Sequence, residues 1–474
     1  HEFLGDEIRA KLLYYPAVSR EGFYWHGKHR RGRITDLLDS GIDDDDDFRD
    51  ALGRNRILLK ESFVPGKDGR DEYGHGNHVA GILGGSGKHS TGPKFDYTIR
   101  GIAPNVKIVS FRVLDKNGAG SDSWVIAAID RAIALKSIYN IRVINISFGR
   151  AVSESYLTDP LCIAVRKAWD AGIVVVAAAG NEGRNNSAGT DGYATITSPG
   201  NSPFVITVGA MNTLGTPGAA DDKIASYSSK GPTLLDHIAK PDLVAPGNRV
   251  MSLKDAGSLL DASYPANRVP LSVYSTENSS NTPDYFVLSG TSMAAPMVSG
   301  AAALLLQHDP TLTPDDVKAR LMKTATKFPT GYSTAVDPAT GATYTSQYDV
   351  FTIGAGYLNI PAALAFTQRL GGPALSPTAV FDTSSGTVML GATDPTGTSA
   401  VWGTSAVWGT SAVWGTSAVW GTSAVWGTSA VWGTSAVWGT SAVWGCSAVW
   451  GTSAVWGTST DPSATAVLTA IIGE

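Results

Sequence analysis

Strand-like and helix-like segments alternate through the first half of the chain. Continuous apolar runs rich in β-branched residues predict strands at 106–114, 142–147, 173–179 and 204–210. Amphipathic patterns between them predict helices at 121–138 and 159–171. Such runs bury both faces of a strand, and their alternation with helices favours parallel pairing. The predicted fold class is therefore α/β, with a doubly wound, mostly parallel sheet flanked by helices.

Composition narrows the class of protein further. The 474 residues include 17% charged residues, and a net charge of −5 gives no basic surface for nucleic acid. No apolar run approaches the roughly 18 residues that a membrane span needs. The two cysteines, Cys162 and Cys446, exclude a disulfide framework. The first four residues, HEFL, do not resemble a signal peptide, so we expect that an exported protein is present here in processed form.

Three polar turns directly follow predicted strands, at 39–41, 147–149 and 180–183. The carboxyl ends of parallel strands lie on one edge of the sheet, and ligands bind in the crevice outside that edge. We therefore expect these turns to gather around an active crevice.

Ser292 stands at the start of a run of small apolar residues that extends to Leu306. The run predicts a buried helix beginning at about Thr291 or Ser292. Pro296 then falls in or just past the first turn, where backbone donors have no intrahelical partner. The positive end of a helix can stabilise negative charge on a reacting group. Ser292 taken alone can equally be an ordinary N-cap.

Two histidines, His75 and His78, stand three residues apart in a predicted helix flanked by glycines. A zinc pair is one interpretation, although the H-E-x-x-H pattern is missing. Nucleophilic catalysis by serine is another, because it needs an imidazole base and a carboxylate that orients the base. Asp39, His75 and Ser292 supply these groups, each at a glycine-rich turn or a helix start.

The segments around these three residues resemble the subtilases, the subtilisin-like serine endopeptidases. They read D-S-G-I at Asp39, G-H-G-N-H-V-A-G at His75 and G-T-S-M-A-A-P at Ser292, and further matches extend over about residues 30–370. The resemblance implies that Ser292 is the nucleophile, His75 the general base and Asp39 its orienting carboxylate, in the subtilisin order. It also implies that Asn181 and the Ser292 backbone N–H form the oxyanion hole, and that His78 is structural.

The same resemblance implies protein or peptide substrates and no cofactor for the chemistry. An extended peptide would add by backbone hydrogen bonds to the strand formed by Ser147, Phe148 and Gly149. The primary specificity pocket would be lined by Ala177, Ala178, Ala179 and Gly180, whose small side chains favour large apolar or broad specificity.

Several features depart from the family pattern. Asn77 replaces a threonine, and because both can hydrogen-bond locally we expect little change. Asp36 lies in a normally apolar strand, so it must point outward, be paired or stay neutral. The acidic run 43–47 can be a solvated loop, a calcium loop or a partner for the basic residues at 28–33, which leaves structural calcium open. Only 38 residues precede Asp39, so we expect a matured form without the family's pro-segment.

The C-terminal part of the chain repeats the hexapeptide S-A-V-W-G-T, with tryptophan at every sixth position from Trp402 to Trp456. An even period keeps each residue type on one face of a strand, which permits a β-solenoid or stacked strands. A disordered low-complexity tail is the alternative. Ordered tryptophans would form an apolar patch that needs a partner, such as another copy of the chain, the peptidase domain or the cell envelope.

We divide the chain into a peptidase domain (1–370), a linker with room for short strands (371–397), the repeat (398–459) and a C-terminal tail (460–474). The preferred hypothesis is a secreted, extracellular or cell-surface serine endopeptidase whose repeat serves anchoring or self-assembly. The rival hypothesis is a structural, filament-forming protein that retains a subtilase fold. The set Asp39, His75 and Ser292 favours the endopeptidase.

Overall fold

The computed structural model describes residues 34–216, 218–276, 283–328, 331–337, 340–369, 372–382 and 387–391. The hexapeptide repeat, the tail after it and the basic residues at 28–33 lie outside the described residues. The expectations that concern them stay predictions.

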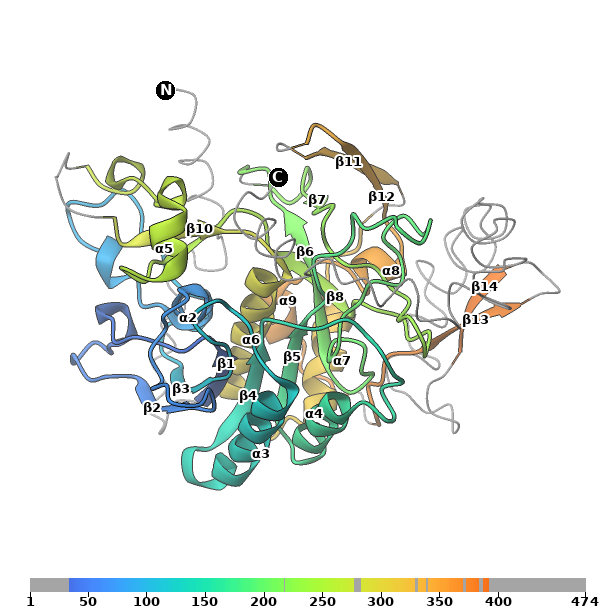
Figure 1. Cartoon of the computed structure of the whole chain (residues 1–474), viewed down its shortest axis with the longest axis horizontal. Helices are drawn as coiled ribbons and strands as arrows, with labels where there is room; N and C mark the ends of the chain where they lie inside the picture. The colour runs from blue at the N-terminus through green and yellow to red at the C-terminus, as the bar shows by residue number, and fades with distance from the viewer. Residues whose placement is uncertain are drawn as a thin grey trace.

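The molecule is built on an eight-stranded sheet in the order β2-β3-β1-β4-β5-β6-β7, with β8 also paired to β6 (Figure 1). Its strands are β1 (Ile34–Asp39), β2 (Ile57–Ser62), β3 (Lys107–Arg112), β4 (Ile141–Ile146), β5 (Val174–Ala178), β6 (Ile206–Asn212), β7 (Lys223–Ile224) and β8 (Leu243–Pro246). Every pairing is parallel except that of β6 with β7. The predicted α/β class with a mostly parallel sheet is confirmed.

Helices cover the sheet, and their ends follow the capping residues in the sequence. The larger ones are α2 (His75–Gly84), α3 (Asp122–Tyr139), α4 (Pro160–Asp170), α6 (Thr291–His308) and α7 (Pro314–Thr324). Asp159 accepts hydrogen bonds from two backbone N–H groups at the start of α4, and Thr313 forms a capping box with Asp316 on α7. In Figure 1, α3 and α4 lie nearest the viewer, with α6 behind the strands. Helix α6 packs against β4, β5, β6, β8 and α2, which makes it the centre of the fold.

Short elements complete the described part of the chain. They are the helices α5 (Leu259–Ser263), α8 (Val350–Ile353) and α9 (Ile360–Ala365), and three antiparallel pairs: β9 (Val250–Leu253) with β10 (Tyr285–Leu288), β11 (Tyr332–Val336) with β12 (Thr343–Gln347), and β13 (Thr378–Asp382) with β14 (Thr387–Gly391). None of the described helices combines the length and the apolar character that crossing a membrane requires.

A buried charge cluster joins the segment before β13 to the sheet. Asp242 accepts hydrogen bonds from Lys240 Nζ at 2.7 Å and Ser376 Oγ at 2.6 Å, and Lys318 Nζ lies 3.2 Å away. All four residues are fully buried. Burial lowers the pKa of Lys240 to about 7, while the two lysines outweigh burial and lower the pKa of Asp242. Ser376 belongs to the stretch that the sequence assigns to a linker, yet it forms part of this core.

Asp36 could point outward, be paired or stay neutral, and the structure favours the neutral form. Its side chain is 0% exposed, and neither carboxylate oxygen has a hydrogen-bond partner among the described residues. Burial raises the pKa of Asp36 well above its ordinary value, and the charge of Glu61 adds to this rise. Because burial outweighs a backbone hydrogen bond from Leu37, the raised pKa favours the neutral acid at this position in β1, an interior strand of the sheet.

Candidate active site

A carboxylate and an imidazole meet at the carboxyl edge of the sheet. Asp39, the last residue of β1, is completely buried, and its Oδ1 lies 2.6 Å from Nδ1 of His75, the first residue of α2. Burial lowers the pKa of His75, but the charge and the hydrogen bond of Asp39 outweigh it, so that the net pKa is raised. The pair therefore fixes the ring so that Nε2 is the nitrogen left for proton transfer.

Asp71 holds this pair in place, and the sequence analysis missed it. Its carboxylate accepts hydrogen bonds from Ser40 Oγ at 2.7 Å and from the backbone N–H groups of Gly74 and Asn77 at 2.7 and 2.8 Å. Ser40 in turn accepts from the Gly76 N–H, which ties the turn after β1 to the start of α2. A Cβ at position 76 would lie 2.1 Å from the Gly41 carbonyl oxygen, so only glycine permits this approach. An acid four residues before His75 was the available signal.

Ser292 occupies the second position of α6, and it is partly exposed. Its backbone carbonyl accepts a hydrogen bond from Ser147 Oγ at 2.9 Å. Asn145 Nδ2 donates a hydrogen bond to Ser147 Oγ, and Asn145 Oδ1 accepts one from Ser299 Oγ, both at 2.8 Å. The end of β4 is thus bonded to two turns of α6. Because α2 also packs against α6, the helix that starts at His75 and the helix that starts at Thr291 form one rigid unit.

Asn181 presents its amide nitrogen beside Ser292. Its Oδ1 accepts hydrogen bonds from the Thr291 backbone N–H at 2.9 Å and from Thr291 Oγ1 at 3.1 Å. A Cβ at Gly290 would lie 3.3 Å from Asn181 Nδ2 and 3.7 Å from the Ser292 backbone nitrogen. The Asn181 amide nitrogen and the Ser292 backbone nitrogen therefore both lie close to Gly290, at the start of α6.

The other sequence-predicted residues surround this centre with different exposures. Ser147 is buried, Phe148 is half-buried and Gly149 is exposed, directly beyond the end of the β4 ladder. Ala177, Ala178 and Ala179 are buried, whereas Gly180 is partly exposed and donates its N–H to Thr291 Oγ1 at 3.1 Å. These positions are consistent with an edge for an extended peptide, and their specificity role stays a prediction.

His78 is not part of a metal pair with His75. Its Nε2 lies 3.2 and 3.1 Å from the carbonyl oxygens of Val250 and Phe286, which ties α2 to β9 and β10. Burial, together with the charge of His75, lowers the pKa of His78 to about 3, so the ring is neutral and donates.

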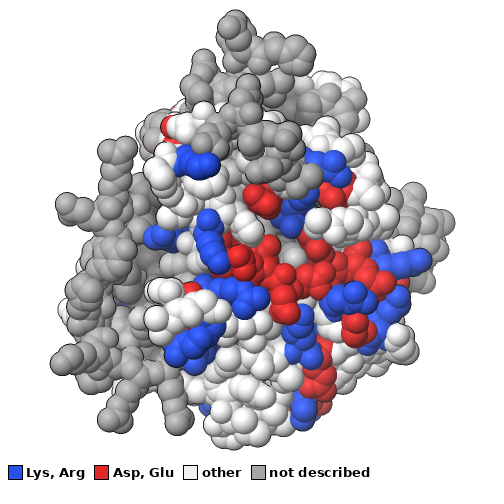
Figure 2. Space-filling view, turned by 90° about the vertical axis from the view of Figure 1, so that its left-hand side faces the viewer, with Lys and Arg blue, Asp and Glu red and all other residues white. Residues whose placement is uncertain are grey.

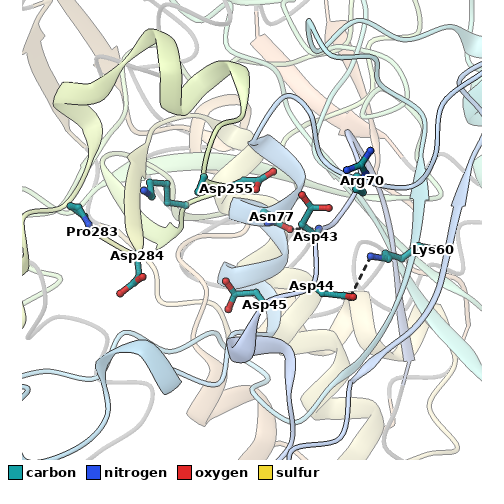
Figure 3. Close-up of a pocket in the computed structure, with 11 residues that line it drawn as sticks. Asp43, Asp44, Asp45, Lys60, Arg70, Asn77, Asp255, Pro283 and Asp284 are labelled. Carbon is teal, nitrogen blue, oxygen red and sulfur yellow. Dashed lines mark hydrogen bonds and ion pairs between the residues drawn. The ribbon is translucent and has the colours of Figure 1, made fainter. Parts of the chain in front are cut away.

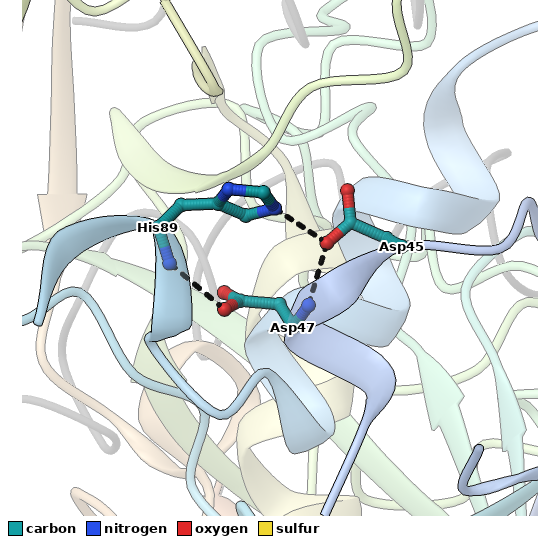
Figure 4. Close-up of side chains that lie close together, drawn as sticks. All are labelled: Asp45, Asp47 and His89. Atoms are coloured by element: carbon teal, nitrogen blue, oxygen red, sulfur yellow. Dashed lines mark hydrogen bonds and ion pairs between the residues drawn. The ribbon is translucent and has the colours of Figure 1, made fainter. Parts of the chain in front are cut away.

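The acidic run after β1 is not a simple solvated loop. Within the described ranges, only Asp45, Asp47 and His89 have ligand atoms close enough for a metal, within 4.8 Å of one another (Figure 4). His89 Nε2 already pairs with Asp45 at 2.8 Å, and Asp47 accepts hydrogen bonds from the backbone N–H groups of Lys88 and His89. Calcium prefers six to eight oxygen ligands, so this group fits an ion pair better than a calcium site.

Comparison with known proteins agrees with this geometry. The model of the Subtilase family matches residues 31–354. Serine protease AprX of Bacillus subtilis is 39% identical over 339 residues, which cover 68% of each chain. Subtilisin DY of Bacillus licheniformis is 35% identical over 309 residues, 65% of this chain and 84% of that protein. Subtilisin E of Bacillus subtilis is 34% identical over 292 residues, 61% of this chain and 59% of that protein.

The fold and the matches define the class of protein as a serine endopeptidase. The chain belongs to the subtilase family, and its enzymatic activity is that of a subtilisin-like peptide-bond hydrolase.

Proposed function

We propose that this chain cleaves peptide bonds through an acyl-enzyme on Ser292, with His75 as the base and Asp39 as its orienting carboxylate. The observation that carries the assignment is the 2.6 Å hydrogen bond from His75 Nδ1 to a fully buried Asp39. It leaves Nε2 to take the proton from Ser292 Oγ as the oxygen attacks the substrate carbonyl. His75 then delivers that proton to the leaving amine, and a water molecule repeats the sequence to release the acid.

The negative oxygen of each tetrahedral intermediate would be bound by Asn181 Nδ2 and the Ser292 backbone N–H. Thr291 supports this role because it occupies the amide oxygen of Asn181 and so turns the NH₂ group toward the site. Donors that are fixed before the charge develops need no reorganisation during the reaction. The acyl half of the peptide would extend along residues 147–149, with its first side chain near 177–180.

Labelling with a fluorophosphonate probe tests the nucleophile. We expect one modified residue, Ser292, located by mass spectrometry of the native protein. Ser292→Ala should abolish the label, whereas Ser123→Ala, at an exposed serine on α3, should keep it. Folded protein that reacts at another serine, or at none, would refute the assignment.

We further propose that the enzyme acts outside the cell and that residues 398–459 anchor it or assemble it with other copies. The support is chemical, because ten regularly spaced tryptophans without intervening charges need an apolar partner. Sedimentation of the full chain against a 1–391 truncation tests assembly, and the truncation keeps Ser376 and its buried bonds. If the full chain and the truncation both sediment as monomers, the assembly proposal is refuted. Structural calcium also stays a prediction, to be tested by metal analysis of the purified protein.

A further inference from the structure

An acidic cavity lies next to the proposed active site. It has a volume of about 450 Å³ and is lined by Asp43, Asp44, Asp45, Lys60, Arg70, Asn77, Lys254, Asp255, Ala256, Pro283 and Asp284 (Figure 3). Figure 2 shows acidic side chains gathered on this side of the molecule, with basic side chains around them. The lining comes from the turn after β1, from Lys60 on β2, from Arg70 and Asn77 before and within α2, and from the segments that follow β9 and precede β10.

The cavity is lined mainly by charged side chains. Five carboxylates and three basic side chains line it, and one of the carboxylates, Asp45, already pairs with His89 Nε2 at 2.8 Å outside the lining. Lys60 is engaged by Asp44 at 3.3 Å, and Lys254 Nζ lies 3.9 Å from Asp261, outside the cavity lining. The pKa values of Asp43 and Asp284 are both raised, chiefly by burial.

Asp255 is the side chain that points to a missing ligand. It is only 9% exposed, and its Oδ2 has no hydrogen-bond partner among the described residues. In Figure 3 the carboxylates of Asp255 and Asp43 point toward one another across the cavity. Burial and the charges of Asp71, Asp43, Asp261 and Asp45 raise the pKa of Asp255 to about 8. A bound cation would satisfy this carboxylate and neutralise the repulsion around it.

The spacing of the carboxylates selects the kind of cation. A metal ion needs several ligand atoms within 4.8 Å of one another, and in the described ranges only Asp45, Asp47 and His89 meet that criterion. Asp43, Asp255 and Asp284 are therefore too far apart to share one ion. They surround a space that suits a guanidinium or ammonium group on a side chain, which carboxylates bind through charge-assisted hydrogen bonds.

The sheet order places the cavity on one side of the reacting bond. Residues 147–149 and 177–180 follow β4 and β5, whereas the cavity is lined by the turn after β1 and by Lys60 of β2, a strand that β3 and β1 separate from β4. The acyl half of a substrate would lie by β4 and β5, so its leaving half passes His75 toward the cavity. Asn77 follows His75 by two residues on α2, about 3 Å along the helix axis, so the cavity begins within one helical turn of the proposed base.

We propose that this cavity binds the side chain of an arginine or lysine in the leaving half of a peptide substrate. The inference rests on the proposed function, because the nucleophile at Ser292 defines which bond is cleaved. Asn77 would then shape the subsite, since its Oδ1 accepts the Asp43 N–H at 2.8 Å and so holds the acidic turn against α2.

The test uses the full chain with Ser292→Ala, so that peptides bind without being cleaved. Fluorescent peptides that span the site carry either arginine or glutamine at each of the first four leaving-half positions. We expect arginine to lower Kd about 10- to 100-fold at one of these four positions, the range for a hydrogen bond to a charged group. Equal Kd values for arginine and glutamine at all four positions would overturn the proposal.

Two variants and one control locate the effect. Asp255→Asn and Asp284→Asn should each reduce the arginine preference, whereas Asp130→Asn, at an exposed position on α3, should leave it unchanged. A preference that survives both cavity substitutions would refute the assignment. The assignment would also be refuted if the protein binds calcium, if Asp255→Asn abolishes that binding, and if the arginine and glutamine peptides have equal Kd values.

Fluorophosphonate labelling of the unsubstituted chain separates this inference from the proposed function. Labelling at Ser292 with equal Kd values for the two peptides would sink the subsite alone. A Kd preference without labelling would sink the catalytic assignment and keep a cation-binding cavity.

Discussion

Replacing Asp36 by valine should change how the stability of the protein depends on pH. Asp36 is completely buried, and neither of its oxygens has a partner, so its pKa is raised in the folded protein. In the unfolded chain the carboxyl has a pKa of about 3.9. Above that pH the unfolded chain releases a proton that the folded protein retains, and the free energy of unfolding falls as pH rises.

The magnitude follows from this linkage. One proton released on unfolding costs about 1.4 kcal/mol of stability per pH unit, or roughly 2.7 kcal/mol between pH 5 and pH 7. The loss is absent below about pH 4 and stops once the pH passes the pKa that Asp36 has in the folded protein. Any packing change caused by the valine side chain does not depend on pH, so it shifts the curve of Asp36→Val without changing its slope.

Urea unfolding followed by circular dichroism at pH 5, 6 and 7 measures the effect, in a Ser292→Ala background that prevents self-digestion. The parent should lose stability relative to Asp36→Val over this range, by up to about 2.7 kcal/mol. Asp130→Asn is the matched control, because Asp130 is exposed and its removal should leave the slope unchanged. Parallel curves for the parent and Asp36→Val would mean that Asp36 is ionised and has a partner, contrary to the argument.

Three further predictions follow from the same coordinates. Asn181→Ala should lower kcat about 10²–10³-fold with little change in KM, which is the loss known for removing the oxyanion donor of subtilisin; steady-state kinetics in which only KM changes would contradict it. His75 must be neutral to act as a base, and its pKa is raised, so kcat/KM should fall at acid pH with an inflection above 6.5. Asp39→Asn should move that inflection to lower pH. An inflection that stays in place would show that Asp39 does not set the pKa of His75. Asp242→Ala leaves Lys240 and Lys318 buried without their anion and should cost about 3–5 kcal/mol by urea unfolding, so a loss below about 1 kcal/mol would argue against an ionised cluster.

The strands and helices that were predicted are each encoded by a local pattern. Continuous apolar runs identified β4 and β5, and the amphipathic pattern at 159–171 identified α4. The turns that follow β1, β4 and β5 were likewise visible as polar residues after apolar runs. Parallel pairing then implied that those turns share an edge.

What could not be predicted depends on contacts between distant residues. Asp71 gains its role from a bond to Ser40, 31 residues earlier, which no periodicity encodes. The acidic run after β1 looked like a solvated loop because its cavity is completed by Asp255 and Asp284, more than 200 residues away. The sequence left three options for Asp36, and only the packing of β1 between β3 and β4 decides among them.

The hairpin of β13 and β14 has a mechanical consequence for an enzyme that is held by its C-terminal region. Gly391 pairs with Thr378, which itself bridges to Ile238, so a pull on the chain after residue 391 acts beside an anchored point. From there the load passes to Ser376 and the Asp242 cluster, at the centre of the fold. Tension that detaches the hairpin must therefore expose buried charges, and the force needed for detachment should fall when Asp242 is removed. A tether attached to the C-terminal region would therefore be coupled to folding stability through four side chains.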